Sequence, residues 1–208
     1  MPHKGNFRRD RTDAQVVEIQ QPAASPRGTL YSIGHSNRSL DDFLNLLHGA
    51  DIRLLIDVRS HPSSRRFPIY NRNALTLALE DEGIAYTWLG RQLGGIRRGK
   101  PDSPHTALAS DGFRGYADHM AGEQFRDGVE QLTALARHQV TVIMCAERDP
   151  NQCHRSMIGD FLLLRDWQLT HLIEHNIRQD HSLSPLARSQ DRLPIYDRLD
   201  QEQLDLSF

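Results

Sequence analysis

Cysteine, lysine and long apolar runs are all scarce in this sequence of 208 residues. The only cysteines are Cys145 and Cys153, which argues against a disulfide scaffold and leaves the two thiols as core residues, metal ligands or reactive groups. No run approaches the roughly 18 consecutive apolar residues that a transmembrane helix needs, and the polar, arginine-containing start lacks the apolar segment of a secretory signal. We therefore predict a soluble, cytoplasmic protein with no membrane partner.

Lysine accounts for only two of the 25 basic residues, Lys4 and Lys100, and the others are arginine. A GC-rich coding bias would produce this skew. Selection for bidentate recognition of phosphate or carboxylate would also produce it, because the planar guanidinium group matches these anions better than an ammonium group does. The composition leaves both explanations open.

Length and composition indicate one globular domain with polar ends. Hydrophobic residues make up 38% of the chain and charged residues 25%, which is typical of a soluble domain that buries a sizeable core. Residues 1–28 combine proline, glycine and charge with few apolar residues and predict a mobile arm. Residues 178–208 predict a polar tail with a short helix near 196–204. The folded domain is therefore expected to span residues 29–177.

Strand and helix patterns alternate within this domain. Short apolar runs indicate buried strands, and apolar residues at helical spacing indicate amphipathic helices. Asp149, Pro150 and Gln152 match the N-cap, first-turn proline and capping box of a helix start. The alternation predicts an α/β fold of three layers, a mostly parallel sheet flanked by helices in a single domain. The expected strands are 29–33, 54–58, 84–89, 140–145 and 169–173, the expected helices are 40–48, 74–83, 113–120, 123–138 and 149–164, and a long loop covers 90–112.

Polar residues follow the expected strands at the edge where α/β sheets bind ligands. His35 and Ser36 follow the first strand, and there His35 suits acid/base chemistry and Ser36 suits contact with an anion at a helix N-terminus. A simple capped turn would have the same sequence. Asp57 interrupts the apolar second strand, so if it is buried it must be paired, and Arg59 is close enough in sequence to pair with it. The two residues are either a catalytic carboxylate with a substrate-binding arginine or an architectural ion pair.

A second group of candidates lies between residues 145 and 155. Cys145 ends a strand, and Cys153 falls at the start of the next helix, where the helix dipole lowers a thiol pKa. Cys153 also shares a helical face with apolar residues, so an inert buried cysteine is the alternative. Glu147 and His154 are candidates for acid/base catalysis. Arg155 lies unfavourably near a helix N-terminus unless its side chain binds a carboxylate or a substrate anion.

Other motifs give less support to specific chemistry. His35, Cys145, Cys153 and His154 would hold a metal only if they converged, and they lack the paired C-x-x-C spacing of a structural zinc site, so a metal is not favoured and the cofactor is unknown. The interval from Cys145 to Arg155 does not match the short cradle of a cysteine-dependent phosphatase. Neither G-x-x-x-x-G-K-S/T nor G-x-G-x-x-G occurs, so the standard nucleotide-binding folds find no support.

A basic stretch covers residues 53–100, with nine basic and four acidic residues. Arg65 and Arg66 lie there in a loop beside the expected site, as candidate substrate-binding residues. Such a field attracts phosphorylated ligands or nucleic acid, for which Phe67, Tyr70 and Trp88 offer stacking faces. A solvated surface loop is the alternative.

Several short motifs together resemble a known family. They are Ile33-Gly34-His35-Ser36, Asp57-Val58-Arg59, Leu93-Gly94-Gly95, and Cys145-Ala146-Glu147 followed by Cys153-His154-Arg155. Their order and spacing resemble the family catalogued as domain of unknown function 488, over about residues 29–177. The resemblance implies a compact α/β domain of bacterial or archaeal type whose motif residues form one site, and it implies no particular reaction.

Three functional hypotheses follow. The leading one is an enzyme acting on a phosphorylated or otherwise anionic small molecule or nucleic-acid component, with Arg59 and Arg155 binding anionic oxygens and Cys145 or Cys153 as nucleophile. The second is a non-catalytic nucleic-acid-binding module that uses the arginine-rich loops. The third is a thiol- or metal-dependent redox protein.

Overall fold

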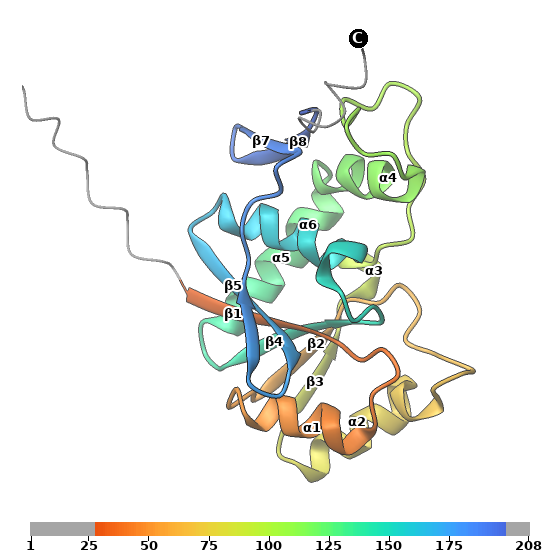
Figure 1. Cartoon of the computed structure of the whole chain (residues 1–208), viewed down its shortest axis with the longest axis vertical. Helices are drawn as coiled ribbons and strands as arrows, with labels where there is room; N and C mark the ends of the chain where they lie inside the picture. Colours follow the sequence, from red (N-terminus) through yellow and green to blue (C-terminus); the bar gives the residue numbers. More distant parts are fainter. Residues whose placement is uncertain (1–27, 199–208) are drawn as a thin grey trace, which may run out of the picture.

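The central element is a six-stranded sheet with the strand order β3-β2-β4-β1-β5-β6. The computed structural model describes residues 28–198 (Figure 1). The first five strands pair in parallel, and only β6 is antiparallel to its neighbour. The strands are β1 (Gly28–Gly34), β2 (Leu54–Asp57), β3 (Ala85–Trp88), β4 (Thr141–Cys145), β5 (Trp167–Glu174) and β6 (Ile177–Asp180).

Helices cover both faces of this sheet, so the predicted three-layer α/β fold in a single domain is confirmed (Figure 1). One face packs against α1 (Leu40–His48) and α2 (Arg72–Asp81). The other face packs against α3 (Gly90–Leu93), α4 (Asp111–Met120), α5 (Glu123–Ala136) and α6 (His154–Leu163). Two 3-10 turns, η1 (Pro68–Tyr70) and η2 (Pro150–Gln152), lie in loops that leave the sheet.

Residues of one strand alternate between the two cores, which explains the continuous apolar runs in the sequence. Leu54 and Ile56 of β2 lie in the core under α4, α5 and α6, whereas Leu55 lies in the core under α1 and α2. All three are at most 2% exposed, and each such burial stabilises the fold by about 1.5–3 kcal/mol. Because both faces are covered, both sets of alternating positions must be apolar.

The order of the strands creates a crevice between β1 and β4. From β1 the chain crosses to β2 through α1, and from β4 it crosses to β5 through α6 on the opposite face of the sheet. The loops that follow β1 and β4 therefore leave the same edge in opposite directions. Ligands of open α/β sheets bind at such a switch point, beside the carboxyl ends of the strands.

The helix that was predicted to begin after Asp149 begins four residues later. The Asp149 carboxylate accepts a hydrogen bond from the Asn151 amide at 2.9 Å, but this cap opens only η2. Cys153 then adopts an extended conformation with φ −140° and ψ 144°, and α6 starts at His154. Cys153 is therefore the N-cap residue of α6, not a member of its first turn.

The boundary predicted at residue 177 is wrong, because the chain continues in regular structure to residue 196. Strand β6 pairs with β5, and β7 (Ala187–Gln190) forms a hairpin with β8 (Leu193–Tyr196). All four residues of β6 are exposed. Because an exposed edge strand can be polar at every position, its sequence resembles that of a polar tail. Tyr196, where the predicted helix near 196–204 would begin, is instead the last residue of strand β8 and is only 1% exposed.

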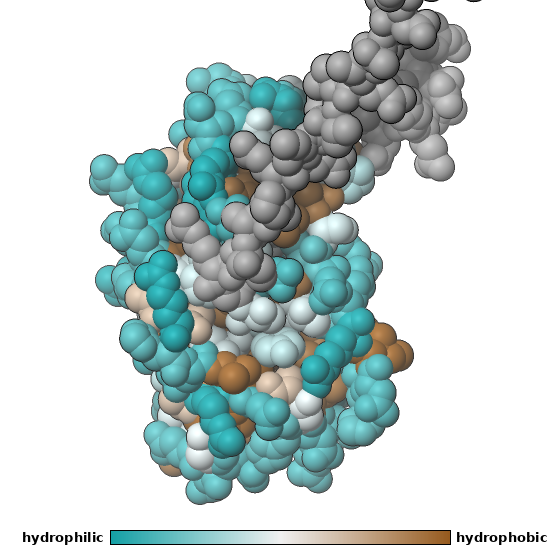
Figure 2. Space-filling view, turned by 90° about the vertical axis from the view of Figure 1, so that its left-hand side faces the viewer, coloured by the Kyte–Doolittle hydropathy of each residue, from teal (hydrophilic) through white to brown (hydrophobic). Residues whose placement is uncertain are grey.

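Residues 1–27 of the predicted arm and 199–208 of the predicted tail lie outside the described residues, whereas Gly28 belongs to β1. Within residues 28–198, no helix is long and apolar enough to cross a membrane. Figure 2 shows one face of the molecule, which is mostly hydrophilic, with apolar residues in small groups between polar ones.

Candidate functional site

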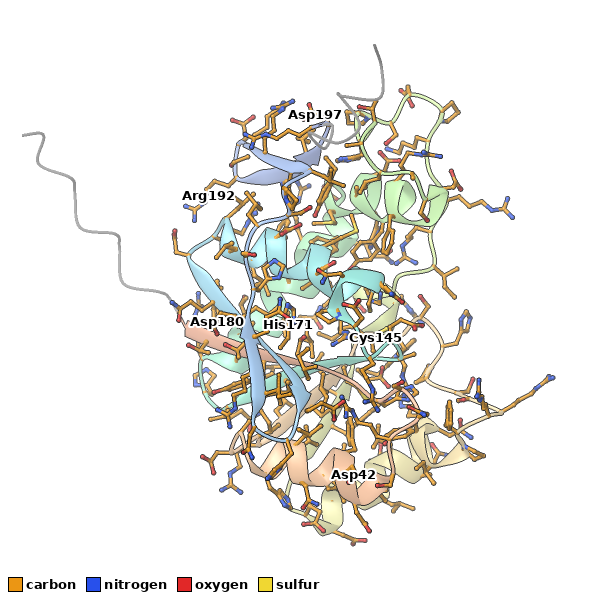
Figure 3. All side chains as sticks on the ribbon, viewed as in Figure 1. Asp42, Cys145, His171, Asp180, Arg192 and Asp197 are labelled. Atoms are coloured by element: carbon orange, nitrogen blue, oxygen red, sulfur yellow. The ribbon has the colours of Figure 1, made fainter. Side chains whose placement is uncertain are left out.

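A cavity of about 910 Å³ lies at the carboxyl edge of the sheet, beside the ends of β1 and β4. Figure 3 labels Cys145, which lies where β4 reaches this edge. Loops that follow β1, β2 and β4 line the cavity, together with the start of α6. Eight of the predicted site residues line it, namely His35, Ser36, Arg59, Arg66, Cys145, Glu147, Cys153 and His154. Asp57, Arg65 and Arg155 do not.

The loops after β1 and β4 are held together by main-chain contacts. The His35 amide donates to the Cys145 carbonyl at 3.0 Å, and the Ser36 amide donates to the Ala146 carbonyl at 2.7 Å. Gly34 permits this approach, because a Cβ atom there would overlap the carbonyl group of Glu147. Gly34 therefore lets the two loops come together at the cavity.

His35 lies in the wall of the cavity with both ring nitrogens engaged. Its Nδ1 lies 3.0 Å from the Ser36 carbonyl, and its Nε2 lies 3.2 Å from Nη1 of Arg59. Since guanidinium only donates, Nε2 is the acceptor and Nδ1 carries the proton. Burial, together with the adjacent charge of Arg59, lowers the pKa of His35 to about 4. His35 is therefore a neutral residue that orients Arg59.

Asp57 lies behind Arg59 and is fully buried. Its carboxylate accepts from Nε and Nη2 of Arg59, with a shortest distance of 2.6 Å, and from the Tyr86 hydroxyl at 2.8 Å. Nη2 of Arg59 also donates to the Tyr70 carbonyl at 2.8 Å. The expected ion pair is present, and its geometry fits the architectural alternative for Asp57, because the carboxylate does not reach the cavity.

Cys145, Cys153 and His154 converge in the cavity wall. The Sγ atoms of Cys145 and Cys153 lie 3.8 and 3.7 Å from Nδ1 of His154. All three ligand atoms lie within 4.8 Å of one another, and the residues are at most 8% exposed. The other ring nitrogen of His154 lies 3.2 Å from the Val58 carbonyl. Two thiols and an imidazole thus converge in this site.

The pKa values of the two thiols are shifted in opposite directions. The pKa of Cys153 lies well below its ordinary value, because it accepts a hydrogen bond from Cys145 and lies beside the charge of Arg155. The pKa of Cys145 lies well above its ordinary value, because it donates that hydrogen bond and is buried. The arrangement favours a thiolate on Cys153 and a thiol on Cys145.

Arg155 does not reach the cavity, in contrast to its expected role in substrate binding. It is 1% exposed, and its Nη2 donates to the Glu147 carbonyl. Its Nε lies 3.4 Å from Sγ of Cys153, and its Nη1 lies 3.3 Å from Oγ of Ser32. The unfavourable position near a helix N-terminus is therefore compensated by a carbonyl and a sulfur atom, not by a bound anion.

A buried polar chain that the sequence did not indicate continues behind Arg155. Oγ of Ser32 lies 2.6 Å from Nδ1 of His171, whose Nε2 lies 3.1 Å from Nδ1 of His181. Nε2 of His181 then lies 2.9 Å from the carboxylate of Asp160. His171 is labelled in Figure 3. These residues come from β1, β5, α6 and the segment after β6, so no sequence motif could have grouped them.

The arginine-rich loops divide into two parts. Arg66 is exposed and lines the cavity, with its guanidinium 5.2 Å from the Phe67 ring centre, whereas its exposed neighbour Arg65 lies outside the cavity lining. Tyr70 is fully buried, and the Trp88 ring nitrogen donates to the Arg59 carbonyl at 2.9 Å. Of the three predicted stacking faces, only Phe67 therefore lines the cavity.

The comparison with protein families agrees with the resemblance noted in the sequence. The family model for a domain of unknown function, DUF488, matches residues 39–162, which is more than half of the chain. The chain belongs to this family. The matched part of the DUF488 domain contains Asp57, Arg59, Cys145, Cys153 and Arg155, and it begins after His35 and Ser36. No curated protein and no solved structure matches the chain.

Proposed function

We propose that this DUF488 protein is an enzyme that binds an anionic small molecule, either a phosphorylated metabolite or a nucleic-acid component, in the cavity at the carboxyl edge of the sheet. The observation behind the proposal is that two thiols and an imidazole converge in the wall of a cavity of about 910 Å³. That volume lies at the upper end of the range for small-molecule sites. Reactive side chains gathered in a concave site are the usual mark of catalysis.

Charge in the cavity supports an anionic substrate. Arg66 lies in the lining, and α6 directs its N-terminal end at the cavity through Cys153 and His154. Arginine and a helix N-terminus both favour phosphate and carboxylate groups. Arg59 contributes less, because Asp57 already neutralises it.

Acid/base chemistry is assigned to Glu147 in this proposal. Its carboxylate is exposed and belongs to the cavity lining, so it can exchange protons with substrate and solvent. His35 is a poorer candidate, because both of its ring nitrogens are engaged and its pKa is lowered to about 4 by burial and by Arg59. His35 and Asp57 instead act as positioning residues for Arg59.

Ligand binding tests the proposal through a pair of adjacent arginines. Inorganic phosphate, a nucleoside monophosphate and a short single-stranded oligonucleotide are titrated against the full chain and against Arg66→Ala and Arg65→Ala. We expect one of the small probes to bind, Arg66→Ala to weaken its binding about tenfold, and Arg65→Ala to change it less than about twofold. Equal losses in both variants, or binding of the oligonucleotide alone, would favour the nucleic-acid-binding module.

Turnover provides the second half of the test. The probe that binds is incubated with the protein, and its products are measured by mass spectrometry. Conversion is expected with the natural chain and is expected to disappear in Cys153→Ser and Glu147→Gln while the fold, measured by circular dichroism, is retained. Conversion that is unchanged in both variants would contradict the assignment of this site.

A further inference from the structure

Cys145, Cys153 and His154 have the spacing of metal ligands. In a tetrahedral site, a metal–sulfur bond of about 2.3 Å and a metal–nitrogen bond of about 2.0–2.1 Å hold sulfur and nitrogen about 3.6 Å apart. The two sulfur–nitrogen distances are 3.8 and 3.7 Å. All three ligand atoms lie within 4.8 Å of one another. The two sulfur–nitrogen distances are therefore within a few tenths of an ångström of the values that a tetrahedral metal requires.

The hydrogen bonds around these residues orient them toward a common centre. Nε2 of His154 is 3.2 Å from the Val58 carbonyl, which can only accept, so Nε2 carries the proton and Nδ1 turns its lone pair toward the sulfur atoms. A ligating histidine usually donates its other N–H to such a partner. Nε of Arg155 donates to Sγ of Cys153 at 3.4 Å, which stabilises negative charge on that sulfur.

The ligands are carried by rigid elements. Cys145 is the last residue of β4 in the middle of the sheet, and Cys153 and His154 are the N-cap and first residue of α6. Gly95 packs directly on the His154 ring, since a Cβ atom there would lie 2.5 Å from Nδ1. Within residues 28–198, no other group of three His, Cys, Asp or Glu side chains converges in this way.

We propose that Cys145, Cys153 and His154 bind a soft divalent cation, with zinc as the first candidate. Two cysteines and one histidine are a known catalytic zinc ligand set, in which three protein ligands leave the fourth position for water or substrate. All three residues line the cavity, so the fourth position would face the substrate. Binding removes the proton of Cys145 and releases it to solvent, so that two thiolates balance the charge of the divalent cation and the site becomes electrically neutral.

The metal gives the proposed enzyme a Lewis acid next to its anionic substrate, and this part of the inference rests on the proposed function. A substrate oxygen or a water molecule at the fourth position would be polarised by the cation. Glu147, in the same lining, is then available to exchange a proton with that ligand. The cysteines act as ligands in this arrangement and not as nucleophiles.

Metal titration of the full chain tests the site without reference to activity. Reduced, metal-free protein is titrated with ZnCl₂ against a competing chelator, and with CoCl₂ as a spectroscopic probe. We expect one equivalent of metal to bind, a thiolate-to-cobalt charge-transfer absorption, and an increase in the thermal unfolding temperature. Cys145→Ser, Cys153→Ser and His154→Ala should each weaken zinc binding by about 100-fold or more, beyond the usual effect of outer-shell partners. His61→Ala, at an exposed residue of the same lining, should leave it unchanged.

The outcomes distinguish this inference from the proposed function. Failure to bind zinc, cobalt binding without the charge-transfer band, or a zinc affinity that none of the three substitutions changes would overturn the metal site. A dithiol that forms a Cys145–Cys153 disulfide and binds no metal would overturn it in favour of redox chemistry. Zinc binding without any anionic ligand would support the metal site while contradicting the proposed substrate class. If a ligand needs Arg66 and no metal binds, the proposed function stands and the metal site fails.

Discussion

Acidification from pH 7 to pH 5 is expected to destabilise this protein through His171. Burial, together with the nearby His181 and Arg155, lowers the pKa of His171 to about 3. An unfolded histidine has a pKa of about 6.5. Folding therefore keeps His171 neutral, and the stability associated with this neutral form is complete above about pH 6.5 and is lost as the pH falls toward the folded pKa.

The magnitude follows from proton linkage. Between pH 7 and pH 5 the unfolded chain takes up a proton at this residue and the folded chain does not, which lowers the free energy of unfolding by about 2 kcal/mol. The value changes little as long as the folded pKa stays below 5. His35, with a pKa lowered to about 4 by burial and by Arg59, adds about 2 kcal/mol in the same direction. In a chain of this size, each contribution lowers the unfolding temperature by about 4–8 °C.

The assay is urea denaturation at pH 7 and pH 5 of the natural chain, His171→Gln and His35→Gln. Each variant is expected to lose about 2 kcal/mol less than the natural chain does between the two pH values. Comparison within each protein removes the fixed cost of losing the hydrogen bonds to Ser32 or Arg59. His138→Gln, at an exposed position after α5, is the control and should show the full loss. If His171→Gln and His35→Gln both show the same pH dependence as the natural chain, the assignment of neutral buried histidines is wrong.

Two further substitutions test the packing around the cavity. Gly95→Ala would bring a Cβ atom to 2.5 Å from the His154 ring and should lower the free energy of unfolding by about 1–3 kcal/mol. The control is Gly112→Ala, where no atom lies nearer than 3.6 Å and the change should be neutral or stabilising by up to about 1 kcal/mol. Equal thermal stabilities of the two variants would refute the close contact. Tyr86→Phe removes the hydroxyl that donates to Asp57 at 2.8 Å and should cost about 1.5–3 kcal/mol in chemical denaturation. A loss below about 0.5 kcal/mol would mean that the Asp57 carboxylate does not depend on this hydrogen bond.

The local pattern of the chain was enough to predict its layers. Strands that are covered on both faces must be apolar at every position, so runs such as 54–56 are recognisable without any tertiary information. Ser39 and Ser110 cap α1 and α4 through local contacts with Asp42 and Phe113. The predictions of strands and helix starts failed where the residues are exposed, and where a capping residue begins a 3-10 turn and not the α-helix that follows it. Polar β6 has the composition of a tail, and Asp149 caps a 3-10 turn in place of the helix.

The sequence by itself determined which residues lie at the carboxyl edge of the sheet, because that follows from strand ends in a parallel α/β fold. Only the tertiary structure decided which of them face the cavity. Asp57 and Arg155 turn away from it, since a buried charge must be satisfied by the nearest partners, here Arg59 for the carboxylate and main-chain carbonyls for the guanidinium. The convergence of Cys145 with Cys153 likewise required the fold, because one residue ends a strand and the other begins a helix, and their meeting depends on the path of the loop between them.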